Sequence, residues 1–193
     1  MKEKPSPILR KTTQQDYREI VWLTREAFWN VHVPGCNEHY LAHMLKNSPD
    51  YLAELDFEAI ADGKIVGHIM YALSTLKDNT GFTHKVITFG PVSVLPSYQG
   101  RGIGSALITH TKALAGKMGH KILIIYGYPA YYCRFGFVAG ENYGIRTADG
   151  LFSPALQAIE LDPRRRESST IRILKGWHII CCYINNYLSF FQN

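Results

Sequence analysis

The spacing of hydrophobic and polar positions predicts two amphipathic helices in the first fifty residues. The first helix is predicted to begin near Thr13, which forms a cap with Asp16 three residues later. Apolar side chains then recur every three or four positions up to Phe28. A second helix is predicted over "NEHYLAHMLKN", with Asn37 as its cap and Pro49 ending it. We expect one apolar face on this second helix, made by Tyr40, Leu41, Met44 and Leu45.

The pattern then changes to that of strands. Two apolar runs in "FEAIADGKIVGHIMYAL" flank Asp62-Gly63, a dipeptide favoured in tight turns, so this segment is predicted to be a β-hairpin. Residues 84–95, "HKVITFGPVSVL", predict a further strand. Proline cannot donate to a strand ladder, so we expect a bulge or a splayed edge at Gly90-Pro91.

A helix is predicted next, from about Gly102 to Met118, with its inner side formed by Ile103, Leu107 and Leu114. "KILIIYG" is short and fully apolar, which is typical of a buried parallel strand. A short helix around Ala130 to Arg134 and strands around Val138 and Leu156 to Leu161 complete the order. The succession α, α, β, β, β, α, β, α, β predicts an α/β layered domain around a mixed sheet.

Length and charge narrow the function classes. The 193 residues suit a single domain over 1–193, with no internal repeat or linker to divide it. The net charge of +5 favours an anionic ligand but is too small to indicate nucleic acid. We interpret the basic run Arg164 to Arg166 as a solvated loop, and expect no nucleic-acid partner.

The cysteines and the chain ends give expectations about metal and location. The four cysteines are Cys36, Cys133, Cys181 and Cys182, and they form no CxxC pair. We therefore expect neither a disulfide framework nor a metal site, and we expect a cytoplasmic location. The first twenty residues lack the apolar core of a signal peptide. The apolar stretch "WHIICCYINNYLSFF" is too short to span a bilayer, so no membrane partner is expected.

One glycine-rich stretch, "LPSYQGRGIGSALI", turns directly into a predicted helix, which is a common way to bind phosphate. A Walker-type loop needs a Lys after its last glycine, but Gly104 is followed by Ser105 and Ala106. A dinucleotide-binding loop needs GxGxxG and an acidic residue about twenty positions later. Here the second gap is one residue short, and the corresponding segment "GHKILII" has no carboxylate.

The segment from Gln99 to Gly104 resembles the Q/R-x-x-G-x-G/A signature of the GCN5-related N-acetyltransferases (GNAT). The preceding "GPVSVLP" is similar to the family's V-x-V-x-P strand, and "AYYCRFGF" resembles its Y-x-x-x-G-F element. The resemblance covers roughly residues 8–140, and leaves 141–193 as a C-terminal extension. Within the family, the chain is similar to the YhbS-like group of bacterial acetyltransferases.

The resemblance implies a three-layer α/β fold, in which a central mixed β-sheet is splayed and flanked by helices. It implies acetyl-CoA as acetyl donor, without a metal. The backbone beside the pantetheine arm would be that of Val92, Ser93 and Val94. Backbone N–H groups at the helix start would bind the pyrophosphate, from a loop made by Gln99, Gly100, Arg101, Gly102, Ile103, Gly104 and Ser105.

The resemblance also implies direct attack of a neutral amine on the thioester, without a covalent enzyme intermediate. The family's motif tyrosine, which protonates the leaving thiolate, maps to Tyr132, with Tyr131 as the alternative. We interpret Cys133 as a small buried residue rather than a nucleophile. The strand "VITFGPVSV" lacks the carboxylate that many members carry, so the general base is left to Glu38 first and His68 second, with His39 and His43 as alternatives.

These features predict an N-acetyltransferase acting on a primary amine, with a small molecule favoured over a protein as acceptor. A homodimer is left open as the assembly. The alternative is a non-catalytic module that binds or senses coenzyme A, since the carboxylate of the central strand is missing. Aromatic residues after position 140 either close the acceptor cleft or belong to the core: Phe152, Trp177 and Tyr183.

Overall fold

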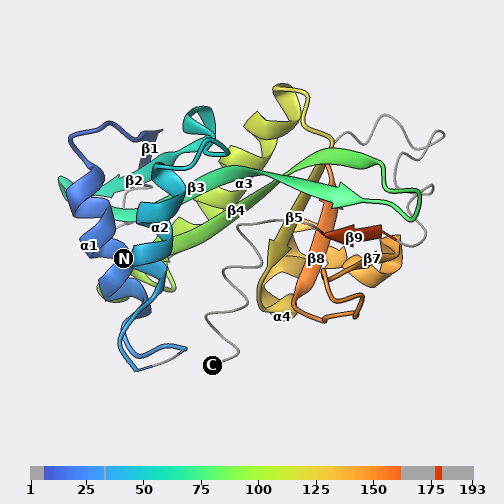
Figure 1. The fold of residues 1–193 in the computed structure, drawn as a ribbon. Helices are drawn as coiled ribbons and strands as arrows, with labels where there is room; N and C mark the ends of the chain where they lie inside the picture. Colours follow the sequence, from blue (N-terminus) through green and yellow to red (C-terminus); the bar gives the residue numbers. More distant parts are fainter. Residues whose placement is uncertain (1–6, 33, 162–176, 180–193) are drawn as a thin grey trace. The chain divides into compact units, whose positions relative to one another are not determined.

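The computed structural model describes residues 7–32, 34–161 and 177–179 (Figure 1). Its strands are β1 Ile8–Lys11, β2 Phe57–Ala61, β3 Lys64–Lys77, β4 Thr83–Val94, β5 Ile122–Tyr126, β6 Val138–Ala139, β7 Ile145–Arg146, β8 Leu156–Glu160 and β9 Trp177–Ile179. Its α-helices are α1 Tyr17–Phe28, α2 Glu38–Lys46, α3 Ile103–Lys117 and α4 Pro129–Tyr132.

The strands follow the order β1-β2-β3-β4-β5-β8-β6, and β9 pairs with β3 and β7. β1 to β3 are antiparallel neighbours, β4 and β5 are parallel, and β5 and β8 are antiparallel. This arrangement confirms the predicted α/β class with a mixed sheet. It also confirms "KILIIYG" as a buried parallel strand, since residues 122–125 of β5 are at most 5% exposed.

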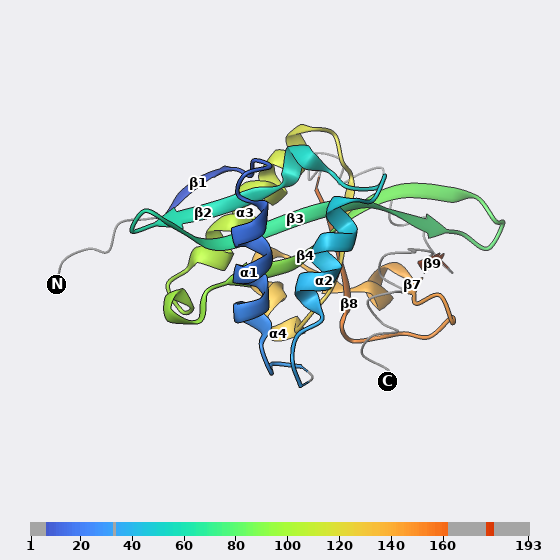
Figure 2. The same ribbon diagram turned by 60° about the vertical axis from the view of Figure 1, so that its left-hand side comes forward.

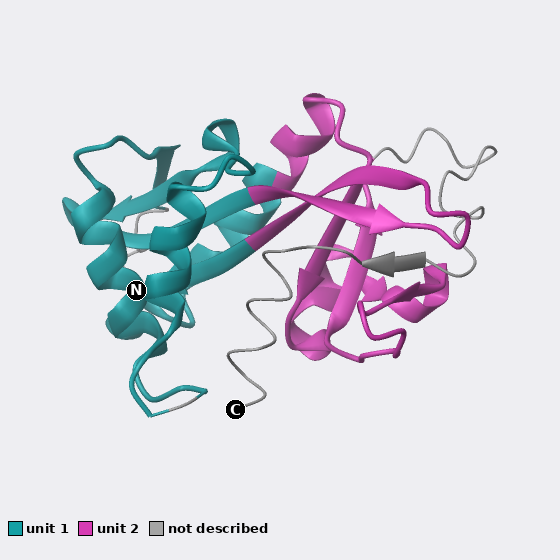
Figure 3. Ribbon diagram, in the orientation of Figure 1, with its two compact units in different colours: residues 1–71, 90–111 teal, residues 72–89, 112–193 magenta. Residues whose placement is uncertain are grey.

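The chain divides into two compact units, which interleave along the sequence (Figure 3). Unit 1 contains residues 1–71 and 90–111, and unit 2 contains residues 72–89 and 112–193. β3, β4 and α3 each run from one unit into the other, so neither unit is a continuous stretch of chain. The organisation of 1–193 as one domain stays a prediction.

Unit 1 is layered, with α1 and α2 side by side over one face of its strands and the start of α3 on the other (Figure 2). Alternate residues of its strands mark the two faces. On β4, the Ser93 hydroxyl donates to Thr24 Oγ1 of α1 at 3.0 Å. On β3, a Cβ built at Gly67 would lie 2.7 Å from Ile103 of α3. Beneath α1, a buried apolar cluster is formed by Ile20, Leu23 and Ile65.

Unit 2 has its own core between β5, β8 and the adjoining parts of β3 and β4. This core consists of aliphatic side chains, all at most 5% exposed: Leu76, Val86, Ile122, Ile124, Ile145, Leu156 and Ala158. Two half-buried tyrosines, Tyr126 and Tyr143, pack against it. In the described part of the chain, no helix has the length and apolar content needed to cross a membrane.

The helix predictions are right in position and partly wrong in detail. Thr13 and Asp16 do pair, with the Thr13 backbone N–H donating to Asp16 Oδ2 at 2.9 Å, but α1 itself begins only at Tyr17. On α2, Tyr40 and Met44 are each 49% exposed, which corrects the predicted apolar face. The buried face of α2 is instead made by Glu38, Leu41, Ala42 and Leu45.

Three short strands were not predicted, namely β1, β7 and β9, each of four residues or fewer. Of the C-terminal aromatic residues, Trp177 begins β9, and Phe152 is 39% exposed beneath the Arg146 guanidinium, 3.8 Å from its ring centre. The interpretation of Arg164 to Arg166, and the predictions for Tyr183, Cys181 and Cys182, fall outside the described residues.

Candidate functional site

The glycine-rich loop forms a tight turn at the start of α3. Gly100 and Gly102 have φ values of 71° and 81°, in the left-handed region that glycine adopts without steric cost. The first helical hydrogen bond runs from Ala106 N–H to Gly102 O at 2.9 Å. A Cβ built at either glycine has nothing within 4 Å, so the space over this backbone is open. The first N–H groups of a helix have no carbonyl one turn earlier, so this end can bind an anion.

Side chains from the loop hold its own backbone in place. Gln99 Nε2 donates to Val94 O at 3.0 Å, and Arg101 Nη2 donates to Ser97 O at 2.5 Å. The Arg101 guanidinium also lies 4.7 Å from the centre of the Tyr98 ring. The Tyr98 hydroxyl in turn donates to Asp62 Oδ2 in the β2–β3 turn at 2.9 Å. The loop is therefore tied both to the end of β4 and to the neighbouring hairpin.

The strand before the loop presents its backbone, and not the Ser93 hydroxyl, to any ligand beside it. Ser93 is fully buried and its hydroxyl is bonded to Thr24, so its side chain faces α1. Val92 and Val94 alternate with it and are half-buried. A contact of Ser93 with a cofactor would use main-chain groups alone.

The first turn of α3 rests on bare backbone of β3. A Cβ at Gly67 would lie 2.7 Å from Ile103 Cγ2, 3.2 Å from Leu107 Cδ1 and 3.3 Å from Ser93 O. Such distances are shorter than van der Waals contact, so the glycine sets how closely α3 approaches the strand. The position of the loop therefore depends on Gly67 as well as on its own glycines.

Tyr132 belongs to unit 2, where its ring lies among other aromatic rings. Phe89 and Phe137 have ring centres 5.9 Å from that of Tyr132. Burial raises the pKa of the Tyr132 phenol, with the nearby Tyr131 adding to the effect, so the group stays protonated near neutrality. A protonated phenol can donate to a developing thiolate.

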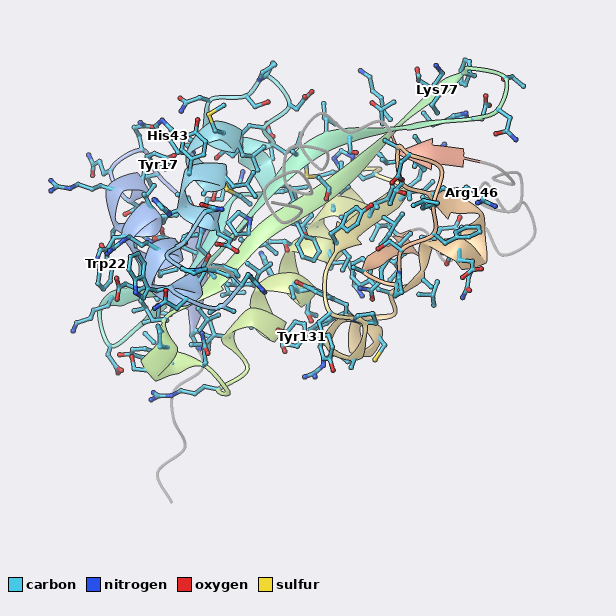
Figure 4. The ribbon with its side chains drawn as sticks, turned by 60° about the horizontal axis from the view of Figure 1, so that its bottom comes forward. Tyr17, Trp22, His43, Lys77, Tyr131 and Arg146 are labelled. Atoms are coloured by element: carbon cyan, nitrogen blue, oxygen red, sulfur yellow. The ribbon has the colours of Figure 1, made fainter. Side chains whose placement is uncertain are left out.

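Tyr132 is itself half-buried, and its two neighbours in the chain have different surroundings. Tyr131 is half-buried and lies 4.7 Å beneath the Arg134 guanidinium (Figure 4). Cys133 is exposed, and this corrects the prediction that it is buried. Its position at the end of a short helix, with Sγ 3.5 Å from Ala130 O, directs it away from the core.

Glu38 lies at the start of α2 and is 2% exposed. Its Oε2 accepts from the Cys36 thiol at 3.4 Å and from the Asn37 backbone N–H at 3.1 Å. Its Oε1 is buried and has no hydrogen-bond partner among the described residues. One carboxylate oxygen is therefore able to accept a further hydrogen bond.

His68 is 1% exposed, and its Nε2 lies 2.7 Å from Asp56 Oδ1. Because a carboxylate only accepts, the hydrogen of this bond is carried by Nε2. No described residue bonds to Nδ1, which is also buried. The other histidine alternatives differ: His39 is half-buried on α2, and His43 is exposed beside the Tyr17 hydroxyl, 3.2 Å from its Nδ1 (Figure 4).

Asp56 is the centre of a buried polar network that the sequence reading did not identify. Besides His68, it accepts from Lys46 Nζ at 3.2 Å and from the Tyr51 hydroxyl. Burial alone would raise the pKa of the Asp56 carboxyl, but the bonds from His68 and Tyr51 outweigh it and hold the pKa well below its usual range.

Glu58 lies directly opposite His68 in the β2–β3 pair and is fully buried, with Arg10 Nε 2.6 Å from its Oε1. A regular two-residue hairpin at Asp62-Gly63 would place Phe57 opposite His68. A register shift between Ala59 and Ile60 moves Glu58 there instead. The sequence does contain a signal for this network, since Asp56 comes just before β2 and Glu58 follows two residues later, on the same side of extended chain.

The structure brings the loop residues, the end of β4, Glu38 and His68 into unit 1, and places Tyr132 in unit 2. Within the described residues, no group of three or more His, Cys, Asp or Glu side chains is placed to hold a metal ion.

Comparison with known proteins connects this geometry to a family. A model of the acetyltransferase (GNAT) family matches residues 15–137, which include the loop and the Tyr132 element. The chain belongs to the GNAT acetyltransferase family.

Relatives of the chain within the GNAT family include the uncharacterized N-acetyltransferase YjhQ of Escherichia coli strain K12. It is 36% identical over 76 residues, which make up 39% of this chain and 41% of YjhQ, so the match spans about two fifths of that relative's length.

Two solved structures are similar in fold. The GNAT protein YhbS of Escherichia coli, solved in complex with CoA, has a TM-score of 0.78 at 20% identity, with 96% of this chain and 95% of YhbS covered. A GNAT acetyltransferase of Brucella melitensis, solved in complex with acetyl-CoA, has a TM-score of 0.64 at 29% identity, with 81% and 89% covered. The predicted family and its layered α/β fold are thereby confirmed.

Proposed function

We propose that this protein transfers the acetyl group of acetyl-CoA to a primary amine of a small-molecule acceptor. The observation that carries the proposal is the loop at the head of α3, with its two left-handed glycines and open space over their backbone. That geometry fits a pyrophosphate, because unpaired N–H groups and the helix dipole favour negative charge. Membership of the GNAT family and the CoA complexes of similar proteins support the same ligand.

Residues of the loop and of β4 would hold the cofactor. The N–H groups of Gly102, Ile103, Gly104 and Ser105 bind the pyrophosphate, while Gln99, Gly100 and Arg101 shape the turn. The backbone of residues 92–94 binds the pantetheine arm. Acetyl-CoA supplies an activated thioester, which the acceptor amine attacks.

Two proton transfers complete the proposed reaction. Tyr132 donates its phenolic proton to the departing thiolate, a role supported by its raised pKa. Glu38 takes the proton of the amine at its unpartnered Oε1, through a water that relays the proton, because this oxygen is buried. His68 is the second candidate base. Its Nδ1 has no hydrogen-bond partner among the described residues, and its burial requires a water or another side chain to relay the proton.

The test is release of free thiol from acetyl-CoA in the presence of a panel of primary amines, compared with reactions lacking either amine or protein. We expect thiol release that needs both. Tyr132→Phe should lower kcat by roughly 100-fold, within the range of general acid catalysis, and leave acetyl-CoA binding unchanged. Saturable acetyl-CoA binding without thiol release for any amine would refute the proposal and favour a non-catalytic coenzyme A-binding module.

A further inference from the structure

Tyr132 is enclosed by four aromatic rings of unit 2. Tyr131 lies edge-on to it with a centre-to-centre distance of 5.0 Å, and Phe135 lies at 6.4 Å. Phe89 and Phe137 complete the set, and they also contact each other edge-on at 6.0 Å. These contacts set where the ring lies, but Tyr132 is only half-buried, so the ring can still shift on its uncovered side.

Another side of the Tyr132 ring lies against the backbone of Gly127. A Cβ built on this glycine would lie 2.2 Å from Tyr132 Cε2, 2.7 Å from Cδ2 and 3.2 Å from Cζ. Carbon atoms in contact are separated by about 3.5–4.0 Å, so the ring occupies the space that any other side chain would need. The contact is with the edge of the ring next to the hydroxyl-bearing carbon.

The backbone of Gly127 is itself held. Its N–H donates to Ala155 O at 2.9 Å, and its carbonyl accepts from Gln157 Nε2 at 3.0 Å. The preceding residue, Tyr126, is paired with Leu156 in the β5–β8 ladder. With the backbone bonded on both sides, a clash at this position is relieved by movement of the Tyr132 ring.

The backbone conformation does not require glycine at this position. The φ angle of Gly127 lies outside the left-handed region, so an alanine could adopt it without strain. Space for the Tyr132 ring is therefore the physical reason for glycine at position 127, and this makes a single substitution informative.

We propose that Gly127 is a positioning residue, whose missing side chain fixes where the Tyr132 hydroxyl lies relative to the leaving thiolate. The inference rests on the proposed role of Tyr132 as general acid. A displacement of about 1 Å in a catalytic group can slow a reaction by up to about 100-fold, since proton transfer depends steeply on geometry.

The experiment compares Gly127→Ala with Tyr132→Phe and with the double variant, in steady-state acetyl transfer to the best amine of the panel. Gly127→Ala should lower kcat by roughly 10-fold or more while the KM for acetyl-CoA stays within about twofold. In the Tyr132→Phe background, Gly127→Ala should change kcat by less than about threefold, because the hydroxyl that it displaces is gone. Gly140→Ala is the matched control: the atoms nearest to its Cβ belong to Leu156 and Ile145 and not to Tyr132, and its kcat should stay near that of the natural chain.

The outcomes are distinguishable. A normal kcat for Gly127→Ala, when Tyr132→Phe is slow, would overturn the inference and leave the proposed function standing. A normal kcat for Tyr132→Phe would instead remove the role of Tyr132 itself. If Gly127→Ala does not fold, the same substitution is made in Tyr132→Ala, where the ring is absent. That double variant should unfold at the temperature of Tyr132→Ala, and a markedly lower temperature would contradict a clash with Tyr132.

Discussion

Asp56→Asn should destabilise the protein substantially, although the substitution preserves the size of the side chain. Asp56 is 2% exposed and accepts from His68, Lys46 and Tyr51. An amide has no charge to balance Lys46 and directs its NH₂ group at one of these donors. Removing one partner of a buried charge pair costs about 3–5 kcal/mol. Lys46 retains 16% exposure, so we expect a loss near the lower end, about 3 kcal/mol.

Urea unfolding at pH 7, followed by circular dichroism, measures this loss. Glu54→Gln is the matched control, because Glu54 is an exposed carboxylate two residues away. It should change the free energy of unfolding by no more than about 0.5 kcal/mol. A loss below about 1 kcal/mol for Asp56→Asn would refute the view that Asp56 stabilises the network as a buried anion.

The same variant should show a characteristic dependence on pH. The folded state holds the pKa of Asp56 below the usual 3.8, so the native protein binds fewer protons than the unfolded chain around that pH. The contribution of Asp56 is therefore present above this value and is lost as the pH falls below it. The stability gap between the natural chain and Asp56→Asn should narrow by about 1 kcal/mol between pH 5 and pH 3, because the slope is about 1.4 kcal/mol per pH unit once the pH is below 3.8. A gap that does not change over this interval would contradict the lowered pKa.

Three further outcomes are expected. Burial raises the pKa of Glu58 from 4.5 to about 7, so between these values the native protein binds more protons than the unfolded chain. In urea titrations, the stability of the natural chain relative to Glu58→Gln should therefore fall between pH 5 and pH 7.5, and a difference in stability that does not change with pH would argue against the raised pKa. Gly67→Ala should lower the free energy of unfolding by about 1–3 kcal/mol, because the added methyl group overpacks against Ile103, and it should weaken acetyl-CoA binding in calorimetry. An unchanged Tm and an unchanged Kd would show that α3 adjusts freely. Ser93→Ala should lower the free energy of unfolding by about 1 kcal/mol, through loss of the hydrogen bond to Thr24, and leave the Kd for acetyl-CoA unchanged. A large rise in Kd would mean that the Ser93 hydroxyl contacts the ligand.

The elements with strong local signals were predictable from the sequence. Asp62 and Gly63 adopt φ values of 51° and 71°, as the tight hairpin turn requires, and β2 and β3 flank them as expected. The glycine-rich loop opens α3 at Ile103, and β5 is the buried parallel strand that its apolar composition indicates. In each case, a short run of residues carries enough information to determine its own conformation.

The features that depend on long-range contacts were not predictable. The register shift at Ala59 brings Glu58 opposite His68, and no local pattern encodes it. Gly127 appears in sequence as an ordinary turn glycine, and its contact with Tyr132 is visible only in three dimensions. β1 has four residues and is recognisable only by its pairing with β2.

The most direct test of the account is calorimetric titration of acetyl-CoA into the natural chain, Gly102→Asp and Gly104→Asp. Asp at these positions adds a negative charge to the proposed phosphate loop, and at Gly102 it also opposes a φ of 81°. Gly119→Asp is the control, because it makes the same substitution at a φ of 90°, beyond the opposite end of α3. We expect saturable binding by the natural chain and the control, and a loss of roughly 10-fold or more, about 1.4 kcal/mol, in both loop variants while each remains folded. Absence of binding by the natural chain, or equal affinity in all four proteins, would contradict the assignment of this loop to the pyrophosphate of coenzyme A.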